Sequence, residues 1–209
     1  MVIEGLDGAG KRTLTKGLTD ALHQAGASVA SLAFPRYGKS VHADLVREAL
    51  HRGHGDLADS VYGMALLYAL DRSGAADEIR TLQATHDVLL LDRYVASNAA
   101  YAAARLSQDA TGEVVKWVWQ LEIDRFALPK PDTHLLLQVS PEVAAARAER
   151  RARADASRPR DAFESDDALQ NRCAQVYKDL AAQSWLSPWH VINGPAQTNP
   201  DTLAKTLLT

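Results

Sequence analysis

The sequence predicts one doubly wound α/β domain over residues 1–209, with a five-stranded parallel sheet and helices on both faces. Three observations lead to this prediction. Short apolar runs alternate with helical patterns along the chain, no repeat or linker interrupts them, and a glycine-rich turn joins the first run to the first helix. A chain of 209 residues is long enough for one well-packed core and short for two.

The first half of the chain supplies three of the predicted strands. Residues 1–4 form a short strand, and leucines four residues apart give the helix Lys11–Ala25 a buried stripe. A second strand is expected at Ser28–Phe34. Asp87–Asp92 is a continuous apolar run that ends in an acid, which is typical of a central parallel strand covered on both faces. The intervening helices are expected at Val41–Leu50, Leu57–Arg72 and Asp77–His86.

The second half continues the alternation and supplies the last two strands. Pro141 opens a helix at the position in the first turn that proline favours, and Asn199-Pro200 begins the terminal helix. The remaining elements are helices at Ala96–Leu106, Glu113–Arg125 and Leu169–Trp185, and strands at Leu135–Val139 and Trp189–Ile192.

A phosphate-binding loop follows the first strand. Gly5, Gly10 and Lys11 fit the P-loop spacing of glycine, four residues, then Gly-Lys. Glycines let consecutive backbone N–H groups point at phosphate oxygens, the helix that follows directs its positive end at the same anion, and lysine adds a charge. The expected nucleotide-binding residues are Asp7, Gly8, Ala9, Gly10, Lys11, Arg12, Thr13 and Leu14.

Arg12 departs from the P-loop pattern. A Ser or Thr usually follows the lysine, and its hydroxyl helps to hold Mg²⁺. Here the hydroxyl comes one position later, at Thr13. We therefore expect unusual metal ligation.

Composition and charge restrict the class of protein. The formal net charge is −3, so any attraction for anions must come from local clusters. The single cysteine, Cys173, rules out an intrachain disulfide and suits a reducing compartment. No apolar run reaches the ~18 residues of a membrane span, and we expect no signal peptide before the P-loop. We expect a cytoplasmic protein without membrane or nucleic-acid partners.

Polar residues follow the predicted strands. Ligands of doubly wound sheets bind outside the carboxyl ends of the strands, so we expect one cleft to collect Asp7, Tyr37, Asp92 and Arg93. Asp92 closes a run like the Walker-B motif and is a candidate to reach Mg²⁺; the alternative is a helix cap or a structural partner for Arg93. The planar donor fork of Arg93 suits an anion clamp.

Arginines concentrate between residues 147 and 160, where six of the sixteen lie: Arg147, Arg150, Arg151, Arg153, Arg158 and Arg160. In a P-loop protein such a segment suits a lid, here at about residues 145–160, that closes over phosphates. One arginine so placed is worth ~10³–10⁵ in rate, and we take Arg151 as the catalytic candidate. The alternatives are a solvated surface or a nucleic-acid site, and the latter lacks interleaved aromatic residues.

Five motifs together resemble the thymidylate kinase family. They are Asp7-Gly8-Ala9-Gly10-Lys11, Phe34-Pro35-Arg36-Tyr37-Gly38, Asp71-Arg72, Asp92-Arg93-Tyr94 and Ser97-Asn98-Ala99-Ala100-Tyr101. Their order and spacing extend the similarity over most of the chain. The resemblance implies an enzyme of dTTP biosynthesis that phosphorylates dTMP to dTDP with ATP and Mg²⁺, usually as a homodimer.

The resemblance also implies how dTMP is held. Tyr37 and Arg93 would bind its phosphate, and Tyr68 would stack on thymine, where Phe is usual. Arg72 and Asn98 would hydrogen-bond the base edge. Residues Phe34 and Pro35 would complete this part of the site, with the proline near the thymine methyl group.

The sugar and metal contacts come from other segments. By the same resemblance, Asp7 would approach the 3′-hydroxyl and the metal, and Tyr101 would sit against the deoxyribose and exclude a 2′-hydroxyl. Asp161, Phe163 and Glu164 would supply a sugar contact, a ring and a metal-linked carboxylate. Phe163 lacks the hydroxyl that the tyrosine of similar proteins would use for a polar contact to the sugar.

The reaction needs no general base if the acceptor is a phosphate, because a second pKa of about 6 leaves it mostly dianionic at pH 7. Catalysis then consists of positioning and charge neutralisation, for which Lys11, Arg12, Arg93 and Arg151 are the candidates. With Arg12 in place of a metal ligand, Mg²⁺ is expected to rely on Asp7, Glu164 and water.

Two other functions stay open at this point. Another P-loop nucleoside or nucleotide kinase, such as a deoxynucleoside kinase, would need a carboxylate base for a hydroxyl acceptor. A nucleotide switch or ATPase would gate a partner, although the guanine-reading Asn-Lys-x-Asp motif is absent. For the homodimer, the helix Leu57–Arg72 and the tryptophan-bearing helix are the expected interface elements.

Overall fold

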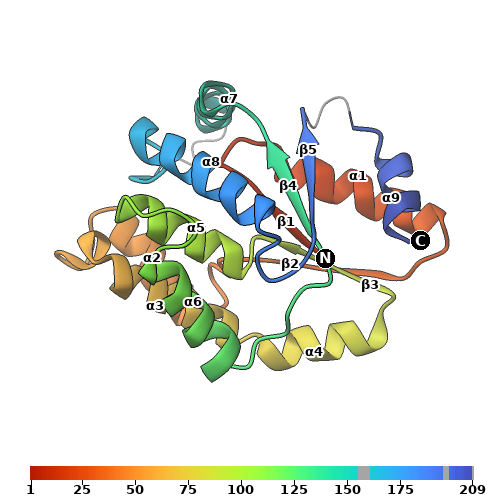
Figure 1. Ribbon diagram of the computed structural model, residues 1–209, viewed down its shortest axis with the longest axis horizontal. Coiled ribbons are helices and arrows are strands. Elements are labelled where there is room, and N and C mark those ends of the chain that lie inside the picture. Colours follow the sequence, from red (N-terminus) through yellow and green to blue (C-terminus); the bar gives the residue numbers. More distant parts are fainter. Residues whose placement is uncertain (155–160, 195–197, 209) are drawn as a thin grey trace.

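Five parallel strands form the centre of the molecule (Figure 1), in a computed structural model that describes residues 1–154, 161–194 and 198–208. The strands lie in the order β2-β3-β1-β4-β5. Their bounds are Val2–Glu4 for β1, Val29–Ala33 for β2, Val88–Asp92 for β3, His134–Gln138 for β4 and Trp189–Asn193 for β5. This sheet confirms the predicted fold class.

Helices cover both faces of the sheet. On one face α1 (Lys11–Gln24) packs with α9 (Pro200–Leu207), as Figure 1 shows. The other face carries α3 (Val61–Ser73), α4 (Ala76–Thr85), α5 (Val95–Arg105), α6 (Glu113–Trp119) and α8 (Asp167–Ala182). Two further helices lie farther from the sheet: α2 (Val41–Leu50) packs on α3, and α7 (Pro141–Ala154) follows the carboxyl end of β4.

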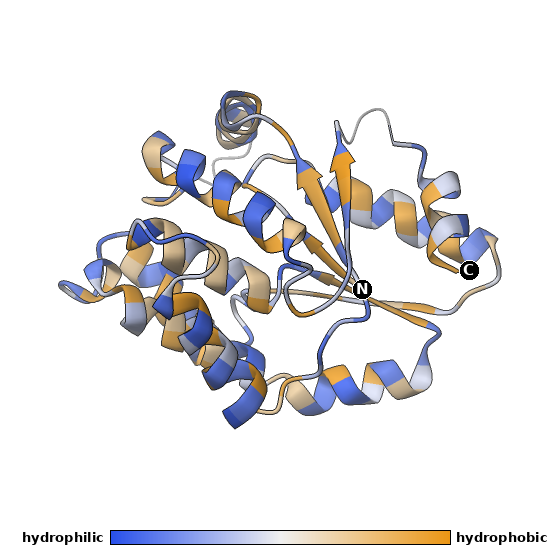
Figure 2. Cartoon of the chain, in the orientation of Figure 1, coloured by the Kyte–Doolittle hydropathy of each residue, from blue (hydrophilic) through white to orange (hydrophobic). Residues whose placement is uncertain are grey.

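The core consists of two apolar layers separated by the sheet. Leu90 of β3 contacts the layer under α1, whereas its neighbours Leu89 and Leu91 contact the layer under α5 and α8. Successive strand residues point to opposite faces, so a strand covered on both sides must be apolar throughout. The central strands are accordingly hydrophobic along their length in Figure 2.

Two predicted helices are interrupted. The expected helix Leu57–Arg72 is wrong as a single element, because a short 3₁₀ turn at Leu57–Asp59 precedes α3. Ser60 separates the two and caps α3, its Oγ accepting from the Gly63 N–H at 3.1 Å. The expected helix Glu113–Arg125 is α-helical only to Trp119, and Gln120–Arg125 forms a π-helix.

The remaining boundaries differ from the predictions by a few residues, as expected where helix ends fray. Of the predicted lid, residues 145–154 belong to α7, whereas Arg158 and Arg160 lie outside the described residues. No helix among the described residues is long and apolar enough to span a bilayer.

Candidate active site

The P-loop curls tightly between β1 and α1. Gly8 has φ of +81° and Gly10, the N-cap of α1, has φ of +103°, conformations that L side chains rarely adopt. A Cβ on Gly8 would lie 2.1 Å from the carbonyl oxygen of Ala144 in α7. Glycine at position 8 therefore serves both the loop and the close approach of the arginine-bearing helix.

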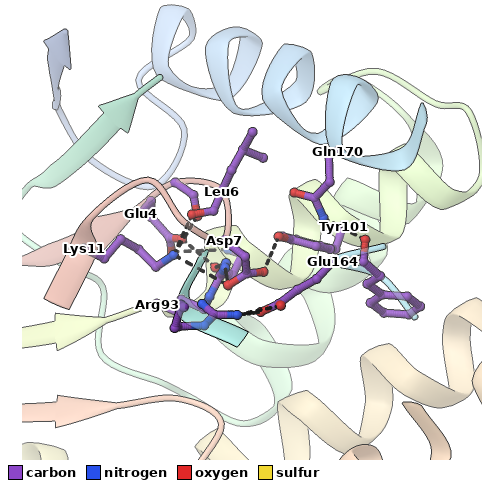
Figure 3. Close-up of polar contacts among 12 residues, drawn as sticks. Glu4, Leu6, Asp7, Lys11, Arg93, Tyr101, Glu164 and Gln170 are labelled. Atoms are coloured by element: carbon purple, nitrogen blue, oxygen red, sulfur yellow. Dashed lines mark hydrogen bonds and ion pairs between the residues drawn. The ribbon is translucent and has the colours of Figure 1, made fainter. Parts of the chain in front are cut away.

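Lys11 folds back onto the P-loop. Its Nζ donates to the carbonyl oxygens of Gly5 at 3.0 Å and Leu6 at 2.9 Å, and lies 4.0 Å from Asp7 Oδ1 (Figure 3). Burial, with help from the nearby positive charge of Arg93, lowers the pKa of Lys11 to about 8, although Asp7 acts in the opposite direction. The Lys11 side chain therefore lines the cavity over the P-loop, and its ammonium group loses a proton more easily than an exposed lysine does.

Asp7, Arg93 and Tyr101 form a connected group at the carboxyl ends of β1 and β3. Arg93 Nη2 donates to Asp7 Oδ1 at 2.8 Å, and the Tyr101 hydroxyl donates to Oδ2 at 3.0 Å. Burial by itself would raise the pKa of Asp7, but the charges of Arg93 and Lys11 hold it well below its usual range. Arg93 has φ of +66°, a strained conformation for a residue with a side chain.

A buried carboxylate that the sequence reasoning missed supports Arg93 from below. Glu4 has no solvent exposure and accepts from the backbone N–H groups of Tyr94 at 3.0 Å and Ser97 at 3.2 Å, and from the Tyr177 hydroxyl at 3.0 Å. Burial raises the pKa of Glu4. Arg93 Nη1 donates to the Ser97 and Tyr177 hydroxyls at 3.0 and 3.3 Å. The available signal was a charged residue at the end of an otherwise apolar strand.

Two adjoining cavities open at this group. The first, of about 690 Å³, is lined by every residue predicted to bind dTMP and by Glu164. Those residues are Asp7, Phe34, Tyr37, Tyr68, Arg72, Arg93, Asn98, Tyr101, Asp161 and Phe163. The fold thus brings all of the predicted dTMP-binding residues to one cavity. The role of each residue stays a prediction.

The second cavity, of about 780 Å³, lies over the P-loop. It is lined by most of the predicted nucleotide-binding residues, namely Asp7, Gly8, Gly10, Lys11, Arg12, Thr13 and Leu14, and also by Asp92. Ala9 is buried instead, and its carbonyl oxygen lies 3.4 Å from Arg147 Nη1. Both cavities include Asp7, Arg93 and Arg151, so they meet between the P-loop and the arginine-bearing helix.

At the far end of the first cavity, Arg72 and Asn98 converge on Glu122. Arg72 donates to both carboxylate oxygens, through Nε at 2.5 Å and Nη2 at 2.8 Å, and Asn98 Nδ2 donates to Oε1 at 2.8 Å. Glu122 lies on the π-helix, a type of turn found frequently at functional sites. No sequence motif marked it, because it has no regular spacing to its partners.

The loop after β2 is tied to α3 by a buried ion pair. Arg36 Nε donates to Asp71 Oδ1 at 2.9 Å, and the Arg36 backbone N–H donates to Oδ2 at 2.9 Å. Tyr37 follows, 42% exposed, with the Arg47 guanidinium 5.5 Å from its ring centroid. The contact between Arg36 and Asp71 therefore holds Tyr37 over the first cavity.

Arg151 and Glu164 form an ion pair in the wall of the first cavity. Arg151 Nη2 donates to Glu164 Oε1 at 2.8 Å and to Oε2 at 2.6 Å. Burial and the charges of Asp7 and Asp161 raise the pKa of Glu164, against the effect of Arg151. The Phe163 ring stacks on Tyr101 with centroids 6.3 Å apart.

The carboxylates around the first cavity suit Mg²⁺. Asp7, Asp161 and Glu164 are oxygen donors around one cavity, which is the ligand chemistry that this ion prefers. Within the described ranges no three acidic, histidine or cysteine side chains are grouped closely enough to form a metal cage. One or two carboxylates completed by water and phosphate is the mode typical of Mg²⁺, and this arrangement fits it.

The P-loop under the second cavity, together with the aromatic and arginine side chains that line the first, defines a P-loop kinase. A family model for thymidylate kinase matches residues 3–194. Thymidylate kinase of Mycobacterium tuberculosis (strain H37Rv) is 55% identical over 207 residues, which cover 99% of this chain and 96% of the relative. Thymidylate kinase of Xanthomonas oryzae pv. oryzae (strain PXO99A) is 34% identical over 201 residues, 95% of this chain and 77% of the relative. The chain belongs to the thymidylate kinase family, which confirms the family and enzyme class predicted from the motifs.

Proposed function

We propose how the two cavities divide the work of a thymidylate kinase, which transfers the γ-phosphoryl group of ATP to dTMP to give dTDP. ATP occupies the cavity over the P-loop, and dTMP occupies the cavity lined by Tyr37 and Tyr68. The observation that carries this assignment is that the cavities meet at Asp7 and Arg93. The acceptor phosphate and the transferred phosphoryl group then face each other across that point.

Charge neutralisation is the main contribution of the protein. Lys11 and Arg12 face the donor phosphates, Arg93 binds the acceptor phosphate, and Arg151 reaches both from α7. The dTMP phosphate has a second pKa of about 6, so it attacks as a dianion without losing a proton to the enzyme. Preorganised cations at an in-line geometry supply most of the catalysis in such reactions.

Magnesium is part of the proposal, with Asp7 and Glu164 as its protein ligands. When bound, the ion would neutralise charge on the transferring phosphoryl group. The residues fit in charge and donor type, and water completes the shell in place of the hydroxyl that Arg12 lacks. To reach the metal, Glu164 exchanges its ion pair with Arg151, which frees that arginine for phosphate.

The nucleoside is held by contacts at three positions. Tyr68 stacks on thymine beside Phe34 and Pro35, and Arg72 and Asn98 bind the base edge. Tyr101, packed on Phe163, lies against the deoxyribose next to Asp7 and leaves no room for a 2′-hydroxyl. Asp161 contacts the sugar from the segment that follows the lid.

The contacts of Asp7 favour a monophosphate acceptor over a nucleoside. A nucleoside kinase needs a carboxylate that can accept a hydroxyl proton. Asp7 is already bonded to Arg93 and Tyr101, and its pKa is held low, which makes it a poor base. The test is turnover of dTMP, dUMP, dCMP and thymidine with ATP and Mg²⁺. We expect dTMP to be fastest, and faster turnover of thymidine would contradict the proposal.

We further infer that the enzyme works as a cytoplasmic homodimer in which residues 1–209 act as one unit. Tyr62 and Leu66 of α3 are 43% and 39% exposed, and Tyr62 packs edge-on against Trp117 of α6 with centroids 5.0 Å apart. Large apolar side chains gathered on two neighbouring helices suit a subunit interface. Sedimentation at micromolar concentration is the test: a dimer is expected, and a monomer would rule the interface out.

A further inference from the structure

Glu122 determines which way the side-chain amide of Asn98 points. Asn98 Nδ2 donates one hydrogen to the carbonyl oxygen of Ala65 at 2.9 Å and the other to Glu122 Oε1 at 2.8 Å. Reversing the amide would place its oxygen against a carbonyl and a carboxylate, both of which only accept hydrogen bonds. With both N–H groups engaged, Oδ1 is the group that Asn98 can offer to a ligand in the cavity.

Glu122 also determines what Arg72 presents. The side-chain hydrogen bonds of Arg72 to described residues go to Glu122, through Nε and Nη2. The guanidinium is planar, so a bidentate contact along one edge fixes the direction of Nη1. Arg72 is 3% exposed and Asn98 is 5% exposed, yet both line the first cavity.

We take Asn98 Oδ1 as the acceptor and Arg72 Nη1 as the donor that these two side chains offer to a base in the first cavity. Thymine and uracil carry an N3–H donor next to the O4 acceptor, which is the complement of that pair. Cytosine carries an N3 acceptor next to an N4 amino donor, which would oppose acceptor to acceptor and donor to donor. Buried polar groups left unpaired in this way discriminate strongly between ligands.

We infer that Glu122 is a positioning residue that makes the enzyme select the hydrogen-bonding edge of thymine over that of cytosine. The inference rests on the proposed role of Arg72 and Asn98 in binding the base. Glu122 does not need to touch the nucleotide. It acts by holding two other side chains with fixed donor and acceptor polarity, from a π-helical turn in which Glu122 itself has no solvent exposure.

The wild-type enzyme provides the first arm of the test. The substrate 5-methyl-dCMP keeps the methyl group, sugar and phosphate of dTMP and changes only the N3 and C4 positions of the ring edge. We expect kcat/KM for dTMP to exceed that for 5-methyl-dCMP by about 10³-fold or more. A preference below about tenfold would overturn the inference, because the polarity of the pair would then be without effect.

The second arm is Glu122→Gln, which retains size but introduces an amide that donates toward Asn98 or Arg72. The ratio of kcat/KM for dTMP to that for 5-methyl-dCMP is expected to fall at least about tenfold. The ratio for dTMP against dUMP is expected to stay within about threefold of wild type, since both bases share one edge. Glu122→Asp keeps an acceptor-only carboxylate and is expected to retain the preference for dTMP.

A matched control separates selectivity from folding. Asp71 is also a buried acid on an arginine, 1% exposed, but its partner is Arg36 and not a base-edge residue. Asp71→Asn is expected to slow turnover of both substrates equally. Circular dichroism shows which variants fold, and Glu122→Ala takes the place of Glu122→Gln if the latter does not.

Turnover of dTMP by the wild-type enzyme distinguishes failure of this inference from failure of the proposed function. If wild-type enzyme does not phosphorylate dTMP, the proposed function itself is wrong. If it does, and Glu122→Gln slows dTMP and 5-methyl-dCMP by the same factor, as Asp71→Asn does, then Glu122 has only a structural role and the inference is overturned.

Discussion

The Tyr101 hydroxyl donates a 3.0 Å hydrogen bond to Asp7, a residue 94 positions earlier in the chain. The two side chains come from the start of the P-loop and from α5, and Arg93 takes the other carboxylate oxygen at 2.8 Å. The acid is thus oriented by one neutral and one charged donor. The wall of the first cavity and the P-loop are thereby joined through Asp7.

Tyr101→Phe removes the neutral donor and keeps the ring. A hydrogen bond to a charged group is worth about 1.5–3 kcal/mol, so we expect kcat/KM for dTMP to fall about 10–100-fold. The phenyl ring still stacks on Phe163 and still blocks a 2′-hydroxyl. Steady-state kinetics with dTMP and with 5-methyluridine monophosphate measure both effects.

Tyr101→Ala is the contrasting variant, since it removes the ring as well as the hydroxyl. Selectivity for the deoxyribonucleotide is expected to survive in Tyr101→Phe and to collapse in Tyr101→Ala. Equal loss of selectivity in the two variants would show that the ring does not exclude the ribonucleotide.

Deprotonation of Lys11 is expected to produce an alkaline limb in the pH profile of kcat/KM for ATP. Its pKa in the free enzyme is about 8, and only the protonated form neutralises phosphate charge. We expect kcat/KM for ATP to fall about tenfold per pH unit above that value, because this parameter reports ionisations of the free enzyme. The limb in kcat is expected at higher pH, since bound polyphosphate favours the ammonium form.

Lys11→Arg tests whether the limb belongs to this residue. A guanidinium stays protonated throughout the accessible range, so the variant is expected to be slower but to lose the fall in kcat/KM near pH 8. An unchanged alkaline limb in Lys11→Arg would assign the ionisation to another group.

Glu164→Gln addresses the metal. The substitution removes an anionic oxygen ligand, and we expect the Mg²⁺ concentration for half-maximal turnover to rise about 10-fold or more. A titration of turnover against Mg²⁺ at saturating ATP and dTMP measures it. Glu149→Gln is the matched control, because Glu149 also pairs with an arginine, Arg153, at 2.6 Å, but on the exposed surface of α7.

A shift in the Mg²⁺ requirement confined to Glu164→Gln supports the ligand assignment. If the Mg²⁺ dependence of Glu164→Gln matches wild type while kcat falls, Glu164 acts only through Arg151, and Asp7 is left as the protein ligand.

His134, a buried residue outside both cavities, is expected to make the stability of the fold sensitive to acid. It has no solvent exposure, stacks on Trp189 at 4.2 Å between centroids, and its Nδ1 lies 2.7 Å from Ser187 Oγ. Burial lowers its pKa from 6.5 to about 3. Below pH 6.5 the unfolded chain binds a proton that the folded chain does not, so the free energy of unfolding falls with pH down to about 3.

The expected loss is about 1.6 kcal/mol between pH 6.5 and pH 5, because the slope reaches 1.36 kcal/mol per unit only once the unfolded imidazole is fully protonated. Urea unfolding at the two pH values, followed by tryptophan fluorescence, measures it. His134→Phe keeps an aromatic ring on Trp189 without a titrating group, and its stability is expected to change less over this interval. An equal change in both proteins would trace the acid sensitivity to other residues.

Local pattern was sufficient for the strands and for the P-loop. The apolar run ending at Asp92 is a central strand, apolar throughout because helices cover both of its faces. The glycines at positions 8 and 10 adopt the positive φ that the P-loop requires. Such features depend on neighbouring residues and on side-chain periodicity, which the sequence records directly. The break at Ser60 and the π-helix after Trp119 were missed, because periodicity does not register a one-residue cap or an inserted turn.

The fold class, the phosphate-binding loop and, through five ordered motifs, the family follow from the sequence alone. Tertiary structure alone decided which buried acids hold the site in place. Glu4 reaches Tyr177 across 173 positions, and Glu122 reaches Arg72 across 50. Such partners meet only where strands and helices pack, because a buried carboxylate must find hydrogen-bond donors or a counter-charge in space.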